Sequence, residues 1–180
     1  MKIAYFAWGS LLWNSDGLDL ETKWKKTNIQ LPLNFSRISD NGKGRLTLVI
    51  DNKNGVYNSI YYAITKVNNL NIAIKNLKKR EGTISKYIGY INLKNESSRY
   101  SERLTQNDIQ IFKSFALKHN IDAIIWTDLF PNFKNFNTDN ALKYIKKHKK
   151  DVPLYNKMIE YIFLCYVHGN IRTPITNFFL

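Results

Sequence analysis

Two features of this sequence place chemically capable groups at unusual positions. The stretch YFAWGSLLW, residues 5–13, is among the most apolar in the chain, yet Gly9 and Ser10 interrupt it. Glu81 directly follows three cations, residues 78–80, at the end of an amphipathic pattern. By position alone Glu81 is a surface acid that balances these cations. A role in proton transfer needs further support.

Three common kinds of site are disfavoured. His119, His148 and His168 lie at expected helix ends, and none is spaced with Cys or carboxylates as metal ligands are, so no metal is expected. The stretch around Ser10 lacks the second glycine of a G-x-S-x-G nucleophile elbow. No lysine follows the Gly-Ser pair, so a phosphate-cradling P-loop is also disfavoured.

The charge balance leaves a nucleic-acid partner as a minor alternative. The 180 residues contain 27 Lys and Arg against 14 Asp and Glu, a formal net charge of +13. The lysines are dispersed through many segments, which disfavours one basic interface. Two basic runs, KKREG at 78–82 and YIKKHKKD at 144–151, keep this alternative open.

The chain has the features of a cytoplasmic protein. Its single cysteine, Cys165, excludes an internal disulfide and is predicted to be a small apolar core residue. No apolar run approaches the roughly 20 residues that span a bilayer, and no signal-peptide pattern begins the sequence. We therefore expect no membrane partner.

The first third of the chain is predicted to be rich in strands. Residues 3–8 form a short buried strand, and residues 29–36 alternate between apolar and polar side chains, with Pro32 favouring an edge or a bulge. Strands at 45–50 and 56–65 follow turns, so residues 29–65 are predicted to form an antiparallel meander.

Helices dominate the remainder. Helical spacing and end signals predict helices at about 69–80, from Thr105, at 138–148 and at 153–168, with strands at 87–93 and 121–129. No linker or repeat divides the chain, so residues 1–180 are predicted to be a single domain of the α+β class, with a small sheet or barrel.

Several of these segments resemble a known family in the same order. YFAWGSLLW resembles the signature strand and loop of the gamma-glutamylcyclotransferase-like superfamily. FSRIS at 35–39, GRLTLVI at 44–50 and KKREG at 78–82 resemble the strands that follow and the position of the catalytic glutamate. IIWTDLFPNF at 124–133 resembles an element of uncharacterised bacterial branches. The resemblance implies a small mixed β-barrel flanked by helices, with a cavity between the Gly-Ser loop and the glutamate.

The resemblance also implies a reaction. The α-amine of a γ-glutamyl amine or peptide attacks its own γ-carbonyl, which closes 5-oxoproline and releases the attached amine. Glu81 would be the general acid and base that moves the proton, and the amides of Gly9, Ser10 and Leu11 would bind the substrate carboxylate or the developing oxyanion. No cofactor is needed.

Three further residues complete the predicted site, and one of them sustains an alternative. Trp8 stands where the family commonly has Tyr and lacks the phenol hydroxyl. A non-catalytic ligand-binding protein of the same fold therefore remains open. Arg37 and Ser39 would help to hold a substrate carboxylate if they face the cavity, and strand alternation leaves their face undecided.

Overall fold

The structure is a computed structural model that describes all residues from Met1 to Leu180. The chain falls into two compact units, each assembled from three segments. The first unit comprises Met1–Ala7, Asn14–Ile29 and Ile60–Leu129, and the second comprises Trp8–Trp13, Gln30–Ser59 and Phe130–Leu180. That the whole chain is one domain stays a prediction.

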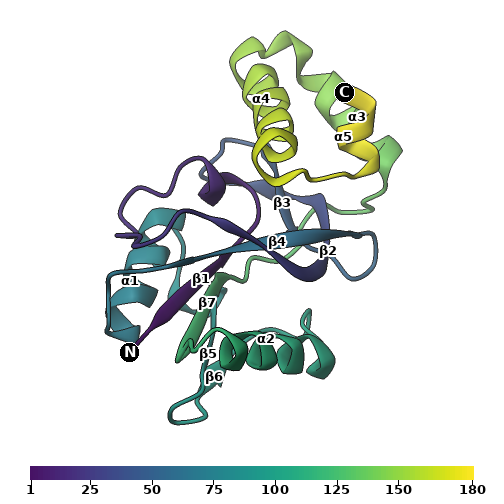
Figure 1. Ribbon diagram of the computed structural model, residues 1–180. Coiled ribbons are helices and arrows are strands. Elements are labelled where there is room, and N and C mark those ends of the chain that lie inside the picture. The colour runs from purple at the N-terminus through teal and green to yellow at the C-terminus, as the bar shows by residue number, and fades with distance from the viewer. The chain divides into compact units, whose positions relative to one another are not determined.

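Seven strands form one mixed sheet in the order β3-β2-β4-β1-β7-β5-β6. Helices flank the strands (Figure 1), which confirms the α+β class. Strands β3 and β6 end the order, so the sheet is open and the predicted closed barrel is wrong. The strands are β1 (Ile3–Ala7), β2 (Lys25–Ser39), β3 (Arg45–Ile50), β4 (Val56–Ile64), β5 (Ile88–Asn92), β6 (Ser98–Arg99) and β7 (Ala123–Thr127).

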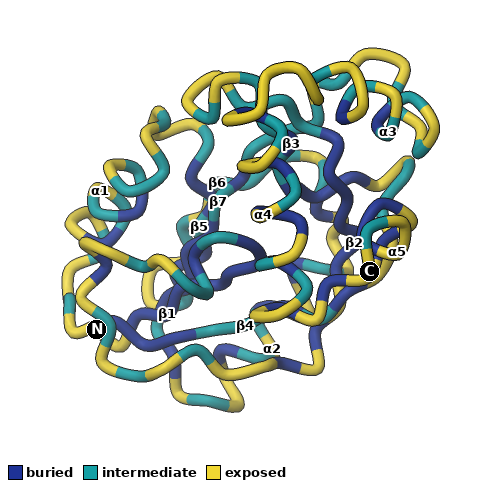
Figure 2. The backbone as a smooth tube through the Cα atoms, turned by 90° about the horizontal axis from the view of Figure 1, so that it is seen from above, coloured by how far each residue is buried: buried dark blue, intermediate teal, exposed yellow.

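In the first unit, β1 is buried along its whole length (Figure 2). It pairs antiparallel with β4 and parallel with β7. Tyr5 donates its hydroxyl to the Ala73 carbonyl of α1 (Leu70–Glu81) at 2.9 Å. The next side chain, Phe6, packs edge-on against Phe112 of α2 (Gln106–Lys118) at 4.9 Å. Adjacent strand residues point to opposite faces, so α1 and α2 cover opposite sides of β1.

The predicted meander is wrong, because β2 lies between β3 and β4 in the sheet. In the turn after β3, just beyond the end of the β2–β3 pairing, the Asp51 amide donates a hydrogen bond to the Pro32 carbonyl at 2.8 Å. A side chain on Gly55 would overlap the backbone of Asp51 and Pro32, so only glycine permits this approach. Pro32 was expected to favour an edge strand or a bulge. Its strand, β2, instead lies between β3 and β4, and the register shift of the β2–β3 pairing falls between Asn34 and Arg37.

The alternating burial expected for residues 29–36 is only partly observed. Burial alternates up to Leu31, but all six residues from Leu31 to Ser36 are buried. Their position inside the sheet, with cover on both faces, overrides the apolar and polar pattern.

The helix signals in the sequence locate most helices well. Asn69 caps α1 at its start and Gly82, with φ 58°, ends it in the left-handed conformation. Thr105 and Asp108 form the predicted capping box of α2. The helix predicted for 138–148 is α3 (Thr138–Lys147), followed by a 3-10 turn, η3 (His148–Lys150).

The second unit ends in two helices, of which only the first was predicted. Helix α4 (Val152–Gly169) ends at Asn170 in the left-handed conformation, one residue beyond the expected Gly169 stop. The final helix, α5 (Pro174–Phe179), is too short for an apolar periodicity to reveal it. Within this unit α4 packs against β3 and against η1 (Ser10–Leu12), a 3-10 turn that follows β1.

Candidate functional site

The Gly-Ser interruption is a partly buried turn that only glycine can begin. Gly9 has φ 87° and ψ −143°, a backbone conformation that is almost confined to glycine. A Cβ on residue 9 would also lie 2.9 Å from the hydroxyl oxygen of Tyr161 on α4. The amides of Leu12 and Trp13 then donate to the carbonyls of Gly9 and Ser10 and close η1. Close contact with α4 thus explains the glycine structurally.

The residues around this turn are withdrawn from solvent. Trp8 is 9% exposed and Leu11 is 4% exposed, whereas Ser10 is partly exposed. The predicted burial of residues 3–8 is confirmed up to Trp8. The role of the amides of Gly9, Ser10 and Leu11 as donors to a ligand stays a prediction.

Tyr161 organises the surroundings of the Gly9 turn. Its ring packs edge-on against Trp13 at 5.7 Å and against Phe35 at 6.1 Å. The Arg45 guanidinium lies over the same ring, 4.0 Å from its centroid, which is the geometry of a cation–π interaction. Tyr161 therefore touches both the turn and a cation of β3.

Cys165 lies one helical turn further along α4 and is fully buried, as predicted for a core residue. Burial raises the pKa of its thiol well above the usual range. A buried thiol held in its protonated form is a poor nucleophile, which fits the predicted core role of Cys165.

The register of β2 and β3 fixes the face of Arg37 and Ser39, which sequence alternation left open. Arg37 pairs with Thr47, and Ser39 pairs with Arg45. Directly paired residues of antiparallel strands point to the same face. Since Arg45 lies over Tyr161, all four side chains stand on the face of these strands that α4 covers.

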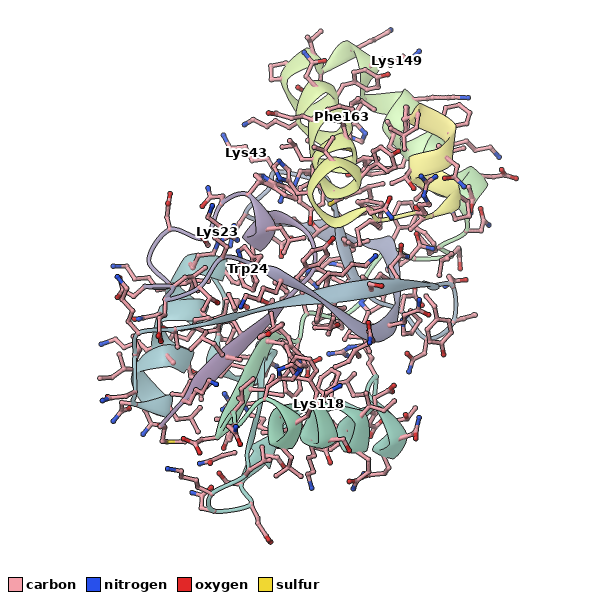
Figure 3. The ribbon with its side chains drawn as sticks, viewed as in Figure 1. Lys23, Trp24, Lys43, Lys118, Lys149 and Phe163 are labelled. Atoms are coloured by element: carbon pink, nitrogen blue, oxygen red, sulfur yellow. The ribbon has the colours of Figure 1, made fainter.

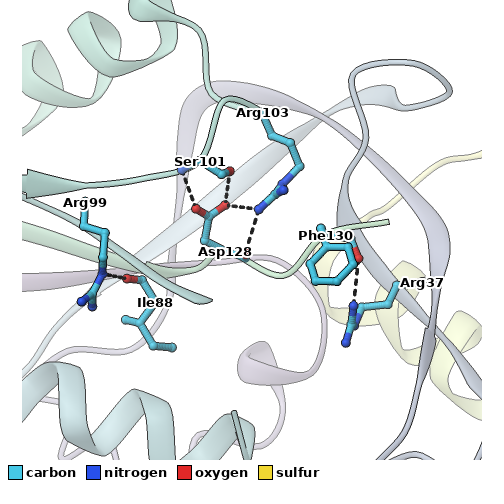
Figure 4. Close-up of polar contacts among 7 residues, drawn as sticks. All are labelled: Arg37, Ile88, Arg99, Ser101, Arg103, Asp128 and Phe130. Carbon is cyan, nitrogen blue, oxygen red and sulfur yellow. Dashed lines mark hydrogen bonds and ion pairs between the residues drawn. The ribbon is translucent and has the colours of Figure 1, made fainter. Parts of the chain in front are cut away.

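Arg37 and Ser39 already have partners within the protein. Arg37 donates to the Phe130 carbonyl at 3.0 Å (Figure 4) and lies 5.0 Å from the centroid of the Phe130 ring. The Ser39 hydroxyl accepts a hydrogen bond from the Gly42 amide at 3.0 Å and so stabilises the turn between β2 and β3. Their predicted contact with a substrate carboxylate stays a prediction.

Two polar atoms on the same face lack partners, and sequence reasoning missed both. The Nε of Arg45 and the hydroxyl of Thr47 are buried without a hydrogen-bond partner in the protein. Buried polar groups are normally paired, so such atoms mark places where a ligand or water is accommodated. In the sequence, Arg45 and Thr47 alternate with Leu46 and Leu48, a pattern that also fits a strand face turned to solvent.

Glu81 is the last residue of α1 and is not a solvent-exposed acid. Its side chain is 14% exposed, and its Oε1 accepts a charge-assisted hydrogen bond from Arg80 Nη1 at 2.6 Å. The other end of the Arg80 guanidinium donates to the Asn14 carbonyl at 2.5 Å. The carboxylate is therefore held by an ordered arginine at the end of the helix.

Glu81 belongs to the first unit, and the turn of Gly9, Ser10 and Leu11 belongs to the second. Their convergence on one cavity, which the family resemblance implies, stays a prediction.

A second polar centre of the first unit is structural in character. Asp128, 3% exposed, accepts hydrogen bonds from the amide and hydroxyl of Ser101 at 2.7 and 2.8 Å and from Arg103 at 3.0 Å (Figure 4). Arg103 also donates to the Asp128 carbonyl at 2.8 Å. This buried carboxylate is well supplied with donors, so it fixes the loop after β6.

Exposed positive charge comes from separate elements. Lys43 lies in the turn before β3, Lys118 at the end of α2 and Lys149 in η3, and all three are exposed (Figure 3). That nucleic acid is not the main partner stays a prediction.

The structure contains no cluster of metal ligands and no helix that could span a membrane. Nowhere do three His, Cys, Asp or Glu side chains come together as ligands of a metal ion would. None of the helices combines the length and apolar character needed to cross a membrane.

No family model matches the chain, and no curated protein or solved structure is significantly similar to it.

Proposed function

We propose that this chain is a gamma-glutamylcyclotransferase-like enzyme that converts the γ-glutamyl group of a small amine or peptide to 5-oxoproline. One observation carries the proposal beyond the sequence resemblance: the Glu81 carboxylate is largely withdrawn from solvent and held by Arg80. The carboxylate does balance Arg80, one of the three cations at 78–80, but its side chain is only 14% exposed, whereas a solvated surface acid would be exposed. A sheltered, oriented carboxylate is what proton transfer requires.

The reaction needs little besides orientation and one proton carrier. The substrate's α-amine nitrogen bonds to its γ-carbonyl carbon, and the bond from that carbon to the leaving nitrogen breaks. Glu81 takes a proton from the attacking amine and delivers it to the leaving amine. Holding the substrate in its folded-back conformation lowers the activation free energy by about 7–11 kcal/mol. Proton transfer by Glu81 would raise the rate by a further factor of about 10² to 10⁴.

The Gly9 turn and β3 provide groups that suit the rest of the substrate. Arg45 forms no ion pair within the protein, and its Nε has no acceptor, so it is suited to bind the substrate's α-carboxylate. The amides of Ser10 and Leu11 at the start of η1 would stabilise the oxyanion that forms on the γ-carbonyl. This role for Arg45 is proposed in addition to the one predicted for Arg37, which stays a prediction.

The test is release of 5-oxoproline from a panel of γ-glutamyl amines and dipeptides. Glu81→Gln keeps the size of the side chain and removes its proton-carrying capacity, so kcat should fall by about 10²-fold or more. Glu160→Gln, at an exposed position of α4, is the matched control and should retain full activity. Undiminished activity of Glu81→Gln would remove Glu81 from the mechanism.

Arg45→Gln separates binding from chemistry in the same assay. If Arg45 holds the α-carboxylate, its loss should raise KM about tenfold or more, with a smaller effect on kcat. An unchanged KM would exclude Arg45 as the carboxylate partner.

Trp8 favours one second candidate, a non-catalytic binding protein of the same fold. Its buried indole replaces the hydroxyl-bearing ring common in the family. Thermal stabilisation by γ-glutamyl compounds without any 5-oxoproline would support this candidate over the enzyme.

A further inference from the structure

We propose that a pocket beside α1 binds a small phosphate-bearing anion. The pocket has a volume of about 270 Å³ and lies wholly within the first unit. Its polar lining residues are Asn71, Lys75, Lys78, Ser85, Tyr90 and Arg99.

The cations converge on this pocket from two elements. Asn71, Lys75 and Lys78 are spaced by four and three residues, so they lie on one face of α1. Arg99 belongs to β6 and pairs in register with Tyr90 of β5. Three positive side chains therefore line one small pocket, and no carboxylate lines it.

Contacts within the protein hold Arg99 in place but leave one of its hydrogen-bond donors without an acceptor. Its Nε donates to the Ile88 carbonyl at 3.0 Å (Figure 4), and its guanidinium lies 5.2 Å from the centroid of the Tyr90 ring. Its Nη2 is buried and has no hydrogen-bond partner in the protein. Leaving such a donor unpaired is costly, and an anion oxygen in the pocket would satisfy it.

The two lysines likewise lack an acidic partner. Neither Lys75 nor Lys78 forms an ion pair, although the neighbouring Arg80 does so with Glu81. Like charges gathered without a counter-charge repel one another, and a dianion such as phosphate would offset two of the three positive charges. The Ser85 hydroxyl and the Asn71 amide can donate to the remaining oxygens.

The size of the pocket selects a compact ligand. Pockets for drug-sized ligands have volumes of about 300–1,000 Å³, so one of about 270 Å³ suits inorganic phosphate or a small phosphate monoester. The proposal does not depend on the 5-oxoproline reaction, because Glu81 is not among the lining residues.

The experiment is calorimetric titration of the full chain with inorganic phosphate at low ionic strength. Lys75→Gln and Lys78→Gln should each weaken binding about tenfold, the effect of losing one charge-assisted hydrogen bond. Lys79→Gln is the matched control: it removes the same charge one residue further along α1, from an exposed side chain outside the pocket. Its affinity for phosphate should be unchanged. Circular dichroism and thermal unfolding establish that each variant is folded.

Further ligands distinguish the sources of the phosphate group. Glycerol phosphate that binds at least as tightly as phosphate, with no binding of glycerol, would support a monoester ligand. Tighter binding of inorganic phosphate would identify the free ion. A mixed-sequence oligonucleotide that displaces phosphate and binds more tightly would overturn the proposal in favour of nucleic acid.

Absence of saturable phosphate binding, or an equal loss of affinity in Lys79→Gln, would also overturn it. Glu81→Gln should bind phosphate like the wild type. Failure of this proposal is therefore distinguishable from failure of the proposed reaction.

Discussion

A Cβ on Gly9 would lie 2.9 Å from the hydroxyl oxygen of Tyr161, so the turn after β1 and helix α4 are in close contact at this point. The relationship accounts for the glycine before any ligand is considered. It also brings the turn and Arg45 to the same aromatic ring. Within the second unit, Tyr161 of α4 therefore contacts both the Gly9 turn and Arg45.

Gly9→Ala should lower the free energy of unfolding by about 3 kcal/mol, since it combines a strained backbone conformation with a clash. Gly17→Ala is the matched control, because Gly17 also has a positive φ, 81°, but nothing lies within 4 Å of its Cβ position. It should cost only about 1 kcal/mol. Urea denaturation measures both values. Adding Tyr161→Phe to Gly9→Ala should relieve part of the larger loss, and equal losses at the two glycines would exclude the clash.

Asp128→Asn should destabilise the protein by about 3–5 kcal/mol, because it leaves the partly buried Arg103 without its counter-charge. Chemical denaturation measures the change. Ser101→Ala removes only the hydroxyl bond and should cost about 1 kcal/mol. A loss in Asp128→Asn no larger than that of Ser101→Ala would show that the ion pair contributes little.

Cys165 should react with a thiol reagent only when the protein unfolds. It is the single cysteine and is fully buried, so labelling reports this residue alone. We expect labelling in native buffer to be at least about 10³-fold slower than in denaturant, as expected for access through rare opening of the fold. Rapid labelling of the native protein would contradict the burial of α4 against the Gly9 turn.

The raised pKa of the Cys165 thiol fixes the sign of its contribution to pH dependence. Below pH 9.0, the ordinary pKa of an exposed thiol, the group is protonated in both the folded and the unfolded state and its contribution to stability is fully present. Above that pH the unfolded chain loses the proton more readily than the folded one, so this contribution decreases as pH rises.

The sequence by itself determined the elements whose signals are local. Asn69 and Gly82 bound α1, and Thr105 with Asp108 begins α2, because caps act through the backbone of their own helix. The burial of Trp8 and Cys165 also followed from their apolar neighbours. Helix α5 was not predicted, because its six residues are too few to show a periodic pattern.

Only the tertiary structure decided what depends on contacts between distant segments. Local alternation cannot tell which strand lies beside β2, so the meander and the barrel were wrong and the face of Arg37 was undecided. The contact of Tyr161 with the Gly9 turn, and the unpaired Arg45 and Arg99 nitrogens, likewise depend on residues far apart in the chain. A residue's type gives its chemistry, but its partners are set by packing, and packing is the sum of many long-range contacts that no short stretch of sequence contains.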